Sequence, residues 1–281
     1  MAKIMIMIYG TTSSAGKSTI ATAMCRYYRD KGYKVCPFKS QNMSRNSFKL
    51  QDGKLISNAQ AIQAYAAGIK ADEYMNPILL VPSSDTGSDV YVLGKLYKHM
   101  NTKEYYSIKK ELKAKVKEVF DELEKKYDVM IIEGAGSPAE INLLEDDFVN
   151  TGMAELADAN AIIVADIDKG GVFASIYGTY MILDEKDRSR IKGYIINKFR
   201  GDASLLDEGI KKLHELTGLD CLGIVPYTKL EIADEDSLHD YEKAVNAHMA
   251  EHDAMNNEID RLADVFQKAI DIDKLNAILG L

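Results

Sequence analysis

The chain has 281 residues, 46% of them hydrophobic, which is enough to bury a full core in one large domain or in one domain with an appendage. Its formal net charge of -8 argues against nucleic-acid binding, because that affinity depends on many Lys and Arg side chains on phosphates. No apolar run reaches the ~20 residues of a membrane span, and the start lacks a signal-peptide pattern, so we expect a cytoplasmic protein without membrane contact. The cysteines are far apart, which predicts neither disulfides nor a zinc site but three buried thiols, Cys25, Cys36 and Cys221.

Short apolar runs alternate along the chain with amphipathic segments of helical length. Strands without in-and-out alternation, separated by helices, predict an α/β fold with a mostly parallel sheet and helices on both faces. Such sheets bind ligands at the carboxyl ends of their strands. After Pro226 the chain becomes acidic and polar, so we expect a main domain over 1–237 and an acidic linker with a C-terminal helical tail over 238–281. The apolar runs lie at 3–9, 34–38, 129–132, 161–165, 194–196 and 221–225, and the helical segments at 17–31, 104–126, 172–183, 203–216 and 261–279.

The first apolar run leads into GTTSSAGKST at 10–19, and a helical segment follows. In a P-loop, backbone N–H groups at a helix N-terminus surround a phosphate, a lysine reaches its oxygens and a hydroxyl holds magnesium. Gly16, Lys17 and Ser18 match the end of this motif, but five residues separate Gly10 from Gly16 where the standard motif has four. The position between a strand and a helix makes a chance match the minor alternative. We predict an ATP site with Mg²⁺ on Ser18, formed by Gly10, Thr11, Thr12, Ser13, Ala15, Gly16, Lys17, Ser18 and Thr19.

A second candidate is YDVMIIEGAGSPAEINL at 127–143. Glu133 ends the apolar run, where its carboxylate can share the magnesium ion of Ser18, and the glycine-rich turn at 134–136 lets the backbone approach phosphates. The alternative is that Glu133 only ends the strand. A charge at the end of an apolar strand is costly without a partner, which favours metal binding. For Glu140, seven residues further on, the two interpretations carry equal weight.

Six segments follow one another in a recognisable order: GTTSSAGKST at 10–19, FKSQNMSRNS at 38–47, MNPILLVPSSDTGSDVYVLGK at 75–95, EGAGSPAEINL at 133–143, DIDKGGVFAS at 166–175 and NKFRGD at 197–202. Over about 3–238 the chain resembles the synthetase domain of the adenosylcobyric acid synthases, glutamine-dependent amidases of cobalamin biosynthesis. Dethiobiotin synthetases and cobyrinic acid a,c-diamide synthases are similar in fold and share the long-spaced loop. The cobyrinic relatives carry aspartates at the positions of Met43 and Asn46, which favours the cobyric branch.

The resemblance implies an ATP-dependent carboxylate-amine ligase. In this family the γ-phosphate moves to a substrate carboxylate, and ammonia then displaces phosphate from the acyl phosphate. The transfer needs in-line positioning and neutralisation of charge. Lys17, Mg²⁺ on Ser18 and Glu133, and Lys39 beside the reacting carboxylate or γ-phosphate are expected to neutralise charge. The residues expected to contact a corrinoid or another polycarboxylate are Gln41, Asn42, Ser44, Asn46 and Glu140.

The last two segments add candidates whose roles the sequence leaves more open. Asp166 and Asp168 are candidates to bind metal, substrate or ammonium, with helix capping as the alternative. In similar proteins the position of Asn197 and Lys198 lies against the nucleotide base. A side-chain amide suits adenine there, because it accepts from N6 and donates to N7. An ordinary turn after a strand is the alternative for both residues.

The chain also departs from the family that it resembles. Full-length members carry a glutaminase domain after the synthetase domain, whereas here about 40 residues follow Ser237 and none of the cysteines lies among them. A glutaminase needs an activated thiolate, so we expect no glutamine hydrolysis by this chain. The expected nitrogen source is free ammonia or a separate glutaminase subunit. Relatives are often dimeric, so a homodimer is one expected assembly, although packing of the terminal helix on its own domain is simpler.

Two other functions remain alternatives. One is a ligase like dethiobiotin synthetase acting on another carboxylate, against which the long match at 38–47 speaks. The other is a nucleotide-dependent switch ATPase of the same fold. Switch proteins of this type carry a second lysine near the start of the loop, where this chain has GTTS at 10–13. The absence of that lysine weakens the switch interpretation.

Overall fold

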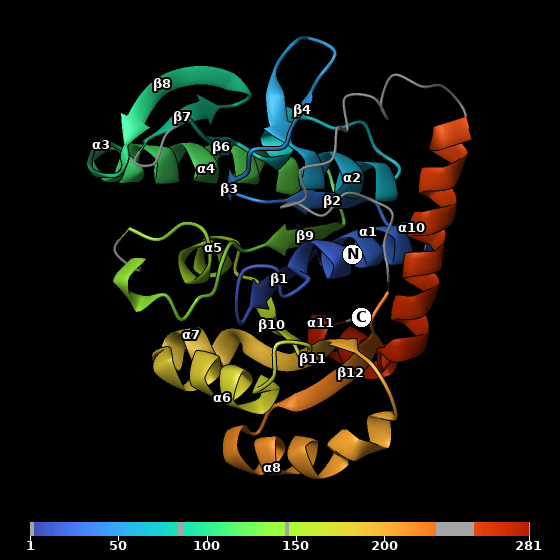
Figure 1. Cartoon of the computed structure of the whole chain (residues 1–281). Helices are drawn as coiled ribbons and strands as arrows, with labels where there is room; N and C mark the ends of the chain where they lie inside the picture. Colours follow the sequence, from blue (N-terminus) through green and yellow to red (C-terminus); the bar gives the residue numbers. More distant parts are fainter. Residues whose placement is uncertain (1–2, 84–86, 144–145, 229–249, 281) are drawn as a thin grey trace.

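The computed structural model describes residues 3–83, 87–143, 146–228 and 250–280, and a parallel sheet of six strands lies at its centre (Figure 1). Its strand order is β12-β11-β10-β1-β9-β2. This arrangement confirms the α/β class and the parallel sheet expected from the sequence, and each of the six apolar runs forms one strand. The strands are β1 (Ile4–Gly10), β2 (Val35–Phe38), β9 (Val129–Glu133), β10 (Asn160–Asp166), β11 (Ile191–Phe199) and β12 (Asp220–Pro226).

Alternate residues of β1 face opposite sides of the sheet, and each side has its own core. Met7 and Tyr9 belong to one apolar cluster, whereas Ile6 and Ile8 belong to the other. Because both faces are buried, the strand is apolar along its whole length. Helices cover both faces, as predicted. One cluster includes residues of α4 (Lys109–Glu124), α5 (Thr151–Leu156), α6 (Val172–Ile182) and α8 (Asp207–Thr217), and the other includes residues of α1 (Lys17–Asp30), α10 (Ala250–Ala269) and α11 (Ile272–Leu279).

A second, smaller sheet and a short hairpin lie beside the end of β2, and the sequence analysis predicted neither of them (Figure 1). The sheet has the order β3-β6-β7-β8, and the hairpin pairs β4 with β5. Three of these strands have only three residues, and β8 is exposed along most of its length, so their apolar pattern is short and weak. The strands are β3 (Gln41–Met43), β4 (Ser47–Lys49), β5 (Leu55–Ser57), β6 (Ile78–Pro82), β7 (Gly87–Val92) and β8 (Lys95–Asn101).

Three predicted helices are interrupted in the structure. The segment at 104–126 forms α3 (Thr102–Ser107) and α4, and the segment at 203–216 forms the 3₁₀ turn η3 (Ala203–Leu206) and α8. The segment at 261–279 belongs to α10, which begins earlier, and to α11. Asp271 accepts a hydrogen bond from the N–H of Lys274 and thereby caps α11, so the chain restarts there as a new helix. In the described ranges no helix is both long and apolar enough to cross a membrane.

Further helical segments were not predicted. They are α2 (Asn58–Ala66), α5, α7 (Glu185–Arg190), η1 (Glu73–Met75) and η2 (Ile141–Leu143). Of these, α2 is the longest, and it packs against α1, β2 and the β4–β5 hairpin, with Ala64 in one core cluster and Ile62 and Ala66 in the other. Its position places several polar side chains next to the end of β2.

The terminal helices pack against the rest of the same chain. Leu262, Phe266 and Leu275 are buried in the cluster that also holds residues of α1 and β1. Arg26 of α1 forms an ion pair with Asp260 of α10 at 3.0 Å. The expectation that the tail packs on its own domain is therefore met by the helices described here. The predicted boundary between 237 and 238 lies outside the described residues.

The three cysteines differ in burial. Cys25 and Cys36 are buried as predicted, and burial raises the pKa of both thiols. The prediction for Cys221 is wrong, because this residue is only half-buried. It lies on β12, which forms the edge of the main sheet and has a strand on one side only.

Candidate functional site

The loop between β1 and α1 has the backbone of a phosphate-binding turn. Gly16 precedes the helix with φ +99°, a conformation that L side chains rarely adopt. A side chain there would also collide with the amide nitrogen of Asn197. The loop therefore requires glycine at this position, and it brings the N-terminus of α1 to the carboxyl end of β1, where the backbone N–H groups of a first helical turn face an incoming ligand.

Lys17 connects this loop to the turn that follows β9. Its Nζ donates to the carbonyl oxygen of Thr12 at 3.1 Å and to that of Gly136 at 2.9 Å. The side chain is buried, so its ammonium group is held between two glycine-rich backbone segments. The sequence analysis placed both segments near phosphates, and the structure joins them through Lys17.

Three side chains meet around the carboxylate of Glu133, which is fully buried at the end of β9. Its Oε1 accepts from the hydroxyl of Ser18 at 2.8 Å and pairs with Nζ of Lys39 at 2.8 Å. Its Oε2 accepts from the amide of Gln63 at 2.6 Å. A buried carboxylate is costly unless it is paired and hydrogen-bonded, and here both oxygens have partners. The structure thus brings together Ser18, Lys39 and Glu133, which the sequence analysis assigned to one site.

The chemistry of this group suits magnesium. Mg²⁺ is bound through one or two carboxylates together with substrate phosphates and water, and a serine hydroxyl at a P-loop is a usual further ligand. The structure provides this donor set with Ser18 and Glu133. In the described part of the chain no group of three or more His, Cys, Asp or Glu side chains is able to hold a metal, so a metal here would depend on the phosphates for further ligands.

Gln63 is the partner of Glu133 that sequence reasoning missed. It lies on α2 and is fully buried, and Gln60, one turn earlier, directs its amide nitrogen toward Gln63 at 3.5 Å and is equally buried. The signal was present as two glutamines three residues apart in the alanine-rich helix NAQAIQAYA. Buried glutamines need partners, so a pair on one helical face points to a polar neighbour.

The segment at 38–47 holds its polar side chains in local contacts. Asn42 donates to the hydroxyl of Ser57 at the start of α2, and Tyr105 donates to the amide oxygen of Gln41. Ser44 accepts from the N–H of Asn46 at 3.0 Å. Asn42 and Ser44 are buried, so they hold the segment in place, whereas Gln41 and Asn46 are only half-buried and remain accessible for substrate.

The candidates after β10 and β11 contact the P-loop. Asn197 donates to the carbonyl oxygen of Ala15 at 3.0 Å, and Lys198 donates to that of Ser14 at 2.7 Å. Asp166 pairs with Lys198 at 3.0 Å and also accepts from the N–H of Asp168 at 2.9 Å. The geometry gives these residues a part in holding the loop, because they fix two successive carbonyl groups just before Gly16.

The contacts that the structure describes for Asp168 and Glu140 are with residues outside the group around Glu133. Asp168 is half-exposed and pairs with Arg200, whose guanidinium group lies 3.7 Å from the centre of the Tyr227 ring. Glu140 is exposed and accepts from the N–H of Ser137 at 2.9 Å, which closes the turn after β9. Arg200 and Tyr227 were not singled out from the sequence.

With this geometry established, comparison with known proteins gives the class of the protein. The family model described as "CobQ/CobB/MinD/ParA nucleotide binding domain" matches residues 6–238, and the chain belongs to this family of P-loop nucleotide-binding domains.

Within the family the chain is similar to cobyric acid synthases. It is 53% identical over 242 residues to that of Clostridium acetobutylicum, covering 86% of this chain and 49% of the relative. It is also 53% identical over 247 residues to that of Clostridium botulinum (strain ATCC 19397 / Type A), covering 88% of this chain and 50% of the relative. The chain thus spans about half the length of these relatives. The resemblance to the synthetase domain that was inferred from six segments is confirmed.

A solved structure with a similar arrangement of elements is the signal recognition particle receptor FtsY from Elizabethkingia anophelis. The match covers 94% of this chain and 65% of that chain, with 13% sequence identity and a TM-score of 0.48. These values are too low to say anything about function.

Proposed function

We propose that this chain catalyses the ATP- and Mg²⁺-dependent amidation of carboxylates on a corrinoid, as the synthetase part of a cobyric acid synthase-like enzyme. The observation that carries the proposal is the contact of the half-buried Ser18 and the buried Lys39 with the buried carboxylate of Glu133, next to the N-terminus of α1. The identity to cobyric acid synthases supports the choice of substrate class. Free ammonia, or ammonia from a glutaminase partner, is the proposed nitrogen source.

The reaction transfers the γ-phosphoryl group of ATP to a substrate carboxylate and releases ADP. The nitrogen lone pair of ammonia then attacks the acyl carbon, phosphate leaves with the bonding electron pair, and the nitrogen loses a proton to give the amide. Phosphoryl transfer depends on positioning and on stabilising charge on the phosphoryl oxygens, not on a covalent contribution from the protein. The side chains of this site supply cations and hydrogen-bond donors, which fits that requirement.

Each residue of the group has a part in this scheme. The N–H groups of the loop and of the first turn of α1 bind phosphate oxygens, and Lys17 supplies a cation at the point where the loop meets the turn after β9. Ser18 and Glu133 would hold Mg²⁺, which when bound would neutralise charge on the phosphates. The ammonium group of Lys39 is a second cation and lies 2.8 Å from Oε1 of Glu133. From there it stabilises negative charge on the reacting carboxylate or the transferred phosphoryl group.

The direct test is ATP turnover with Mg²⁺ and ammonium chloride, with and without adenosylcobyrinic acid a,c-diamide, while mass spectrometry follows the corrinoid. We expect ADP release in step with the replacement of a hydroxyl by an amino group at each converted carboxyl. Lys17→Ala is expected to lower the rate by at least about 10²-fold, because it removes a cation that stabilises the transferred phosphoryl group. Lys211→Ala, an exposed lysine on α8, serves as the control and should leave the rate unchanged. An unchanged corrinoid mass despite ATP binding would contradict the proposal.

A further inference from the structure

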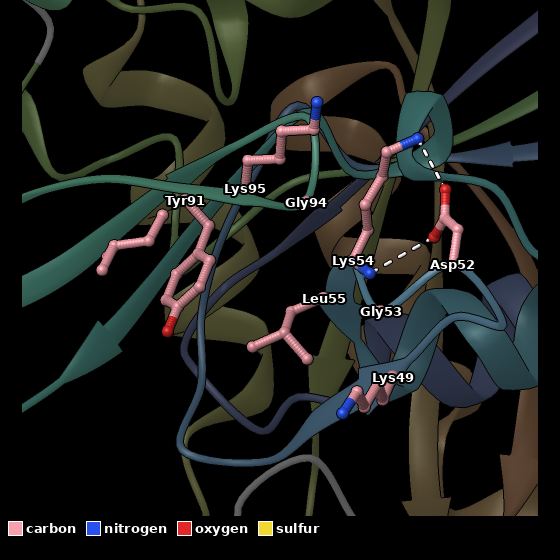
Figure 2. Close-up of a pocket in the computed structure, with 9 residues that line it drawn as sticks. Lys49, Asp52, Gly53, Lys54, Leu55, Tyr91, Gly94 and Lys95 are labelled. Carbon is pink, nitrogen blue, oxygen red and sulfur yellow. Dashed lines mark hydrogen bonds and ion pairs between the residues drawn. The ribbon is translucent and has the colours of Figure 1, made fainter.

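A pocket of about 660 Å³ lies between the β4–β5 hairpin and the turn that joins β7 to β8 (Figure 2). None of its residues belongs to the group around Glu133. It is a shallow pocket that is widely open to solvent, as a site for a charged molecule that stays partly hydrated would be. The lining residues are Lys49, Asp52, Gly53, Lys54, Leu55, Tyr91, Gly94, Lys95 and Leu96.

The two hairpins meet at Gly94. The N–H of Leu55 donates to the carbonyl oxygen of Gly94 at 2.9 Å. Gly94 has φ +73°, and a Cβ atom there would lie 2.5 Å from Cβ of Lys54, so only glycine permits this approach. The β4–β5 and β7–β8 hairpins therefore contact each other closely at the wall of the pocket.

The charge of the pocket is unusual for this chain. Three lysines line it with one aspartate, although the chain as a whole carries a net charge of -8. Lys54 pairs with Asp52 at 2.7 Å and with Glu73 at 2.6 Å, so it adds no positive charge to the pocket. Lys49 and Lys95 are exposed, and in the described part of the chain the structure records no ion pair for either of them. Two such cations beside one cavity attract an anion.

The cavity also offers apolar surface. In Figure 2 the side chain of Leu55 lies between the ring of Tyr91 at the left and Lys49 at the lower right, and the ammonium groups of Lys54 and Lys95 lie toward the top. Leu96, which also lines the pocket, is 59% exposed. Large apolar side chains that stay exposed beside a pocket are a feature of ligand-binding surfaces. A ligand that matches this pattern has an apolar body with anionic groups at its edge.

We infer that this pocket binds the non-reacting part of a polycarboxylate substrate, with its apolar face on Tyr91, Leu55 and Leu96 and its peripheral carboxylates on Lys49 and Lys95. This inference rests on the proposed function and adds an anchoring subsite to it. The pocket continues the predicted substrate segment, because β4, which ends at Lys49, begins directly after Asn46. Binding energy from parts of a substrate remote from the reacting group helps to place that group for reaction.

The test uses the Lys49→Gln/Lys95→Gln double variant of the full chain. Titration with the corrinoid in the absence of ATP should give a Kd about tenfold higher than that of the wild type, as expected for the loss of two exposed charge contacts. The salt dependence of binding should decrease as well. The affinity for ATP should stay the same, because neither lysine contacts the phosphate-binding loop in the described structure. Leu96→Gln should raise Kd without changing the salt dependence, and Lys211→Gln is the matched lysine control.

A second probe separates this inference from the proposed function. Benzenehexacarboxylate carries an apolar ring with carboxylates at its edge, and its binding requires no catalysis. We expect it to bind the wild type and to bind the double variant at least several-fold more weakly. Equal binding of both probes to the wild type and the double variant would overturn the subsite, even if the wild type amidates the corrinoid. Absence of amidation with intact, lysine-dependent binding of the probe would overturn the proposed function alone.

Discussion

Glu133 combines complete burial with a charge and with three side-chain donors. Replacing a buried ion pair by apolar residues of similar volume is often neutral or stabilising, so stability alone does not account for Lys39 and Glu133 at the centre of the molecule. The partners of the carboxylate are also unequal. One oxygen faces Ser18 and Lys39, whereas Gln63 holds the other. We interpret Gln63 as a positioning residue that fixes the plane of the carboxylate and leaves Oε1 directed at Ser18.

The role of Gln63 predicts a specific defect for Gln63→Leu. The substitution removes the donor to Oε2 of Glu133, so the carboxylate is less firmly oriented toward Ser18. The Mg²⁺ concentration that half-saturates ATP turnover should rise several-fold, as expected for loss of a partner that orients a metal ligand. A buried carboxylate oxygen without its donor should also lower the free energy of unfolding by about 1–3 kcal/mol, measured in urea.

Gln51→Leu provides the matched control, because Gln51 is exposed and its contact is with the exposed Lys70 at 3.0 Å. It should change the free energy of unfolding by no more than about 0.5 kcal/mol and leave the Mg²⁺ requirement unaltered. If Gln63→Leu lost stability but kept the wild-type Mg²⁺ requirement, Gln63 would be a structural residue only.

At the scale of elements, the burial of a strand determines how clearly the sequence predicts it. The six strands of the main sheet are apolar because helices cover both faces, and their carboxyl ends bring Gly10, Glu133 and Asn197 to one edge. The strands of the smaller sheet and the hairpin carry no such signal, since they are short and partly exposed. Gln63 was missed for a related reason: α2 is too short and too small in its side chains to stand out, and only tertiary packing turns its glutamines toward β9.

The junction of the two hairpins predicts that Gly94→Ala destabilises the protein more than Gly32→Ala does. Both glycines have positive φ, +73° and +88°, so both substitutions cost about 1–2 kcal/mol of backbone strain. A Cβ atom at Gly32 has nothing within 4 Å, whereas one at Gly94 meets Lys54 and Leu55. Gly94→Ala should therefore cost about 1–3 kcal/mol more, the usual range for overpacking, and should weaken corrinoid binding.

Urea unfolding gives the loss of free energy of unfolding for Gly94→Ala and for Gly32→Ala. The difference between the two losses reports the contact between the hairpins, because the backbone strain is common to both variants. Equal losses of stability would mean that the β7–β8 turn moves away from the β4–β5 hairpin without cost. The pocket would then be a loose surface feature.

At the scale of the whole molecule, the site depends on elements from distant parts of the chain. Lys17 ties the loop after β1 to the turn after β9, and side chains at the end of β11 hold two of its carbonyl groups. Segments on both sides of β1 therefore fix the loop. The last helices add a further support, because α10 packs along α1, the helix that begins at Lys17. The tail is thus part of the body that orients the phosphate-binding loop.

This packing predicts the effect of Phe266→Ala in α10. Phe266 is 1% exposed, and its ring centre lies 6.1 Å from that of Tyr27 on α1. Removing a buried phenylalanine costs about 3–5 kcal/mol through lost burial and the cavity that remains. We expect this loss in a single cooperative unfolding transition followed by circular dichroism, together with weaker ATP binding, because α1 loses its support. Gln267→Ala, its exposed neighbour on the same helix, should change neither quantity appreciably. If Phe266→Ala instead produced a separate early transition and left ATP affinity intact, the tail would be an independent appendage, since only a shared core couples its unfolding to that of the sheet.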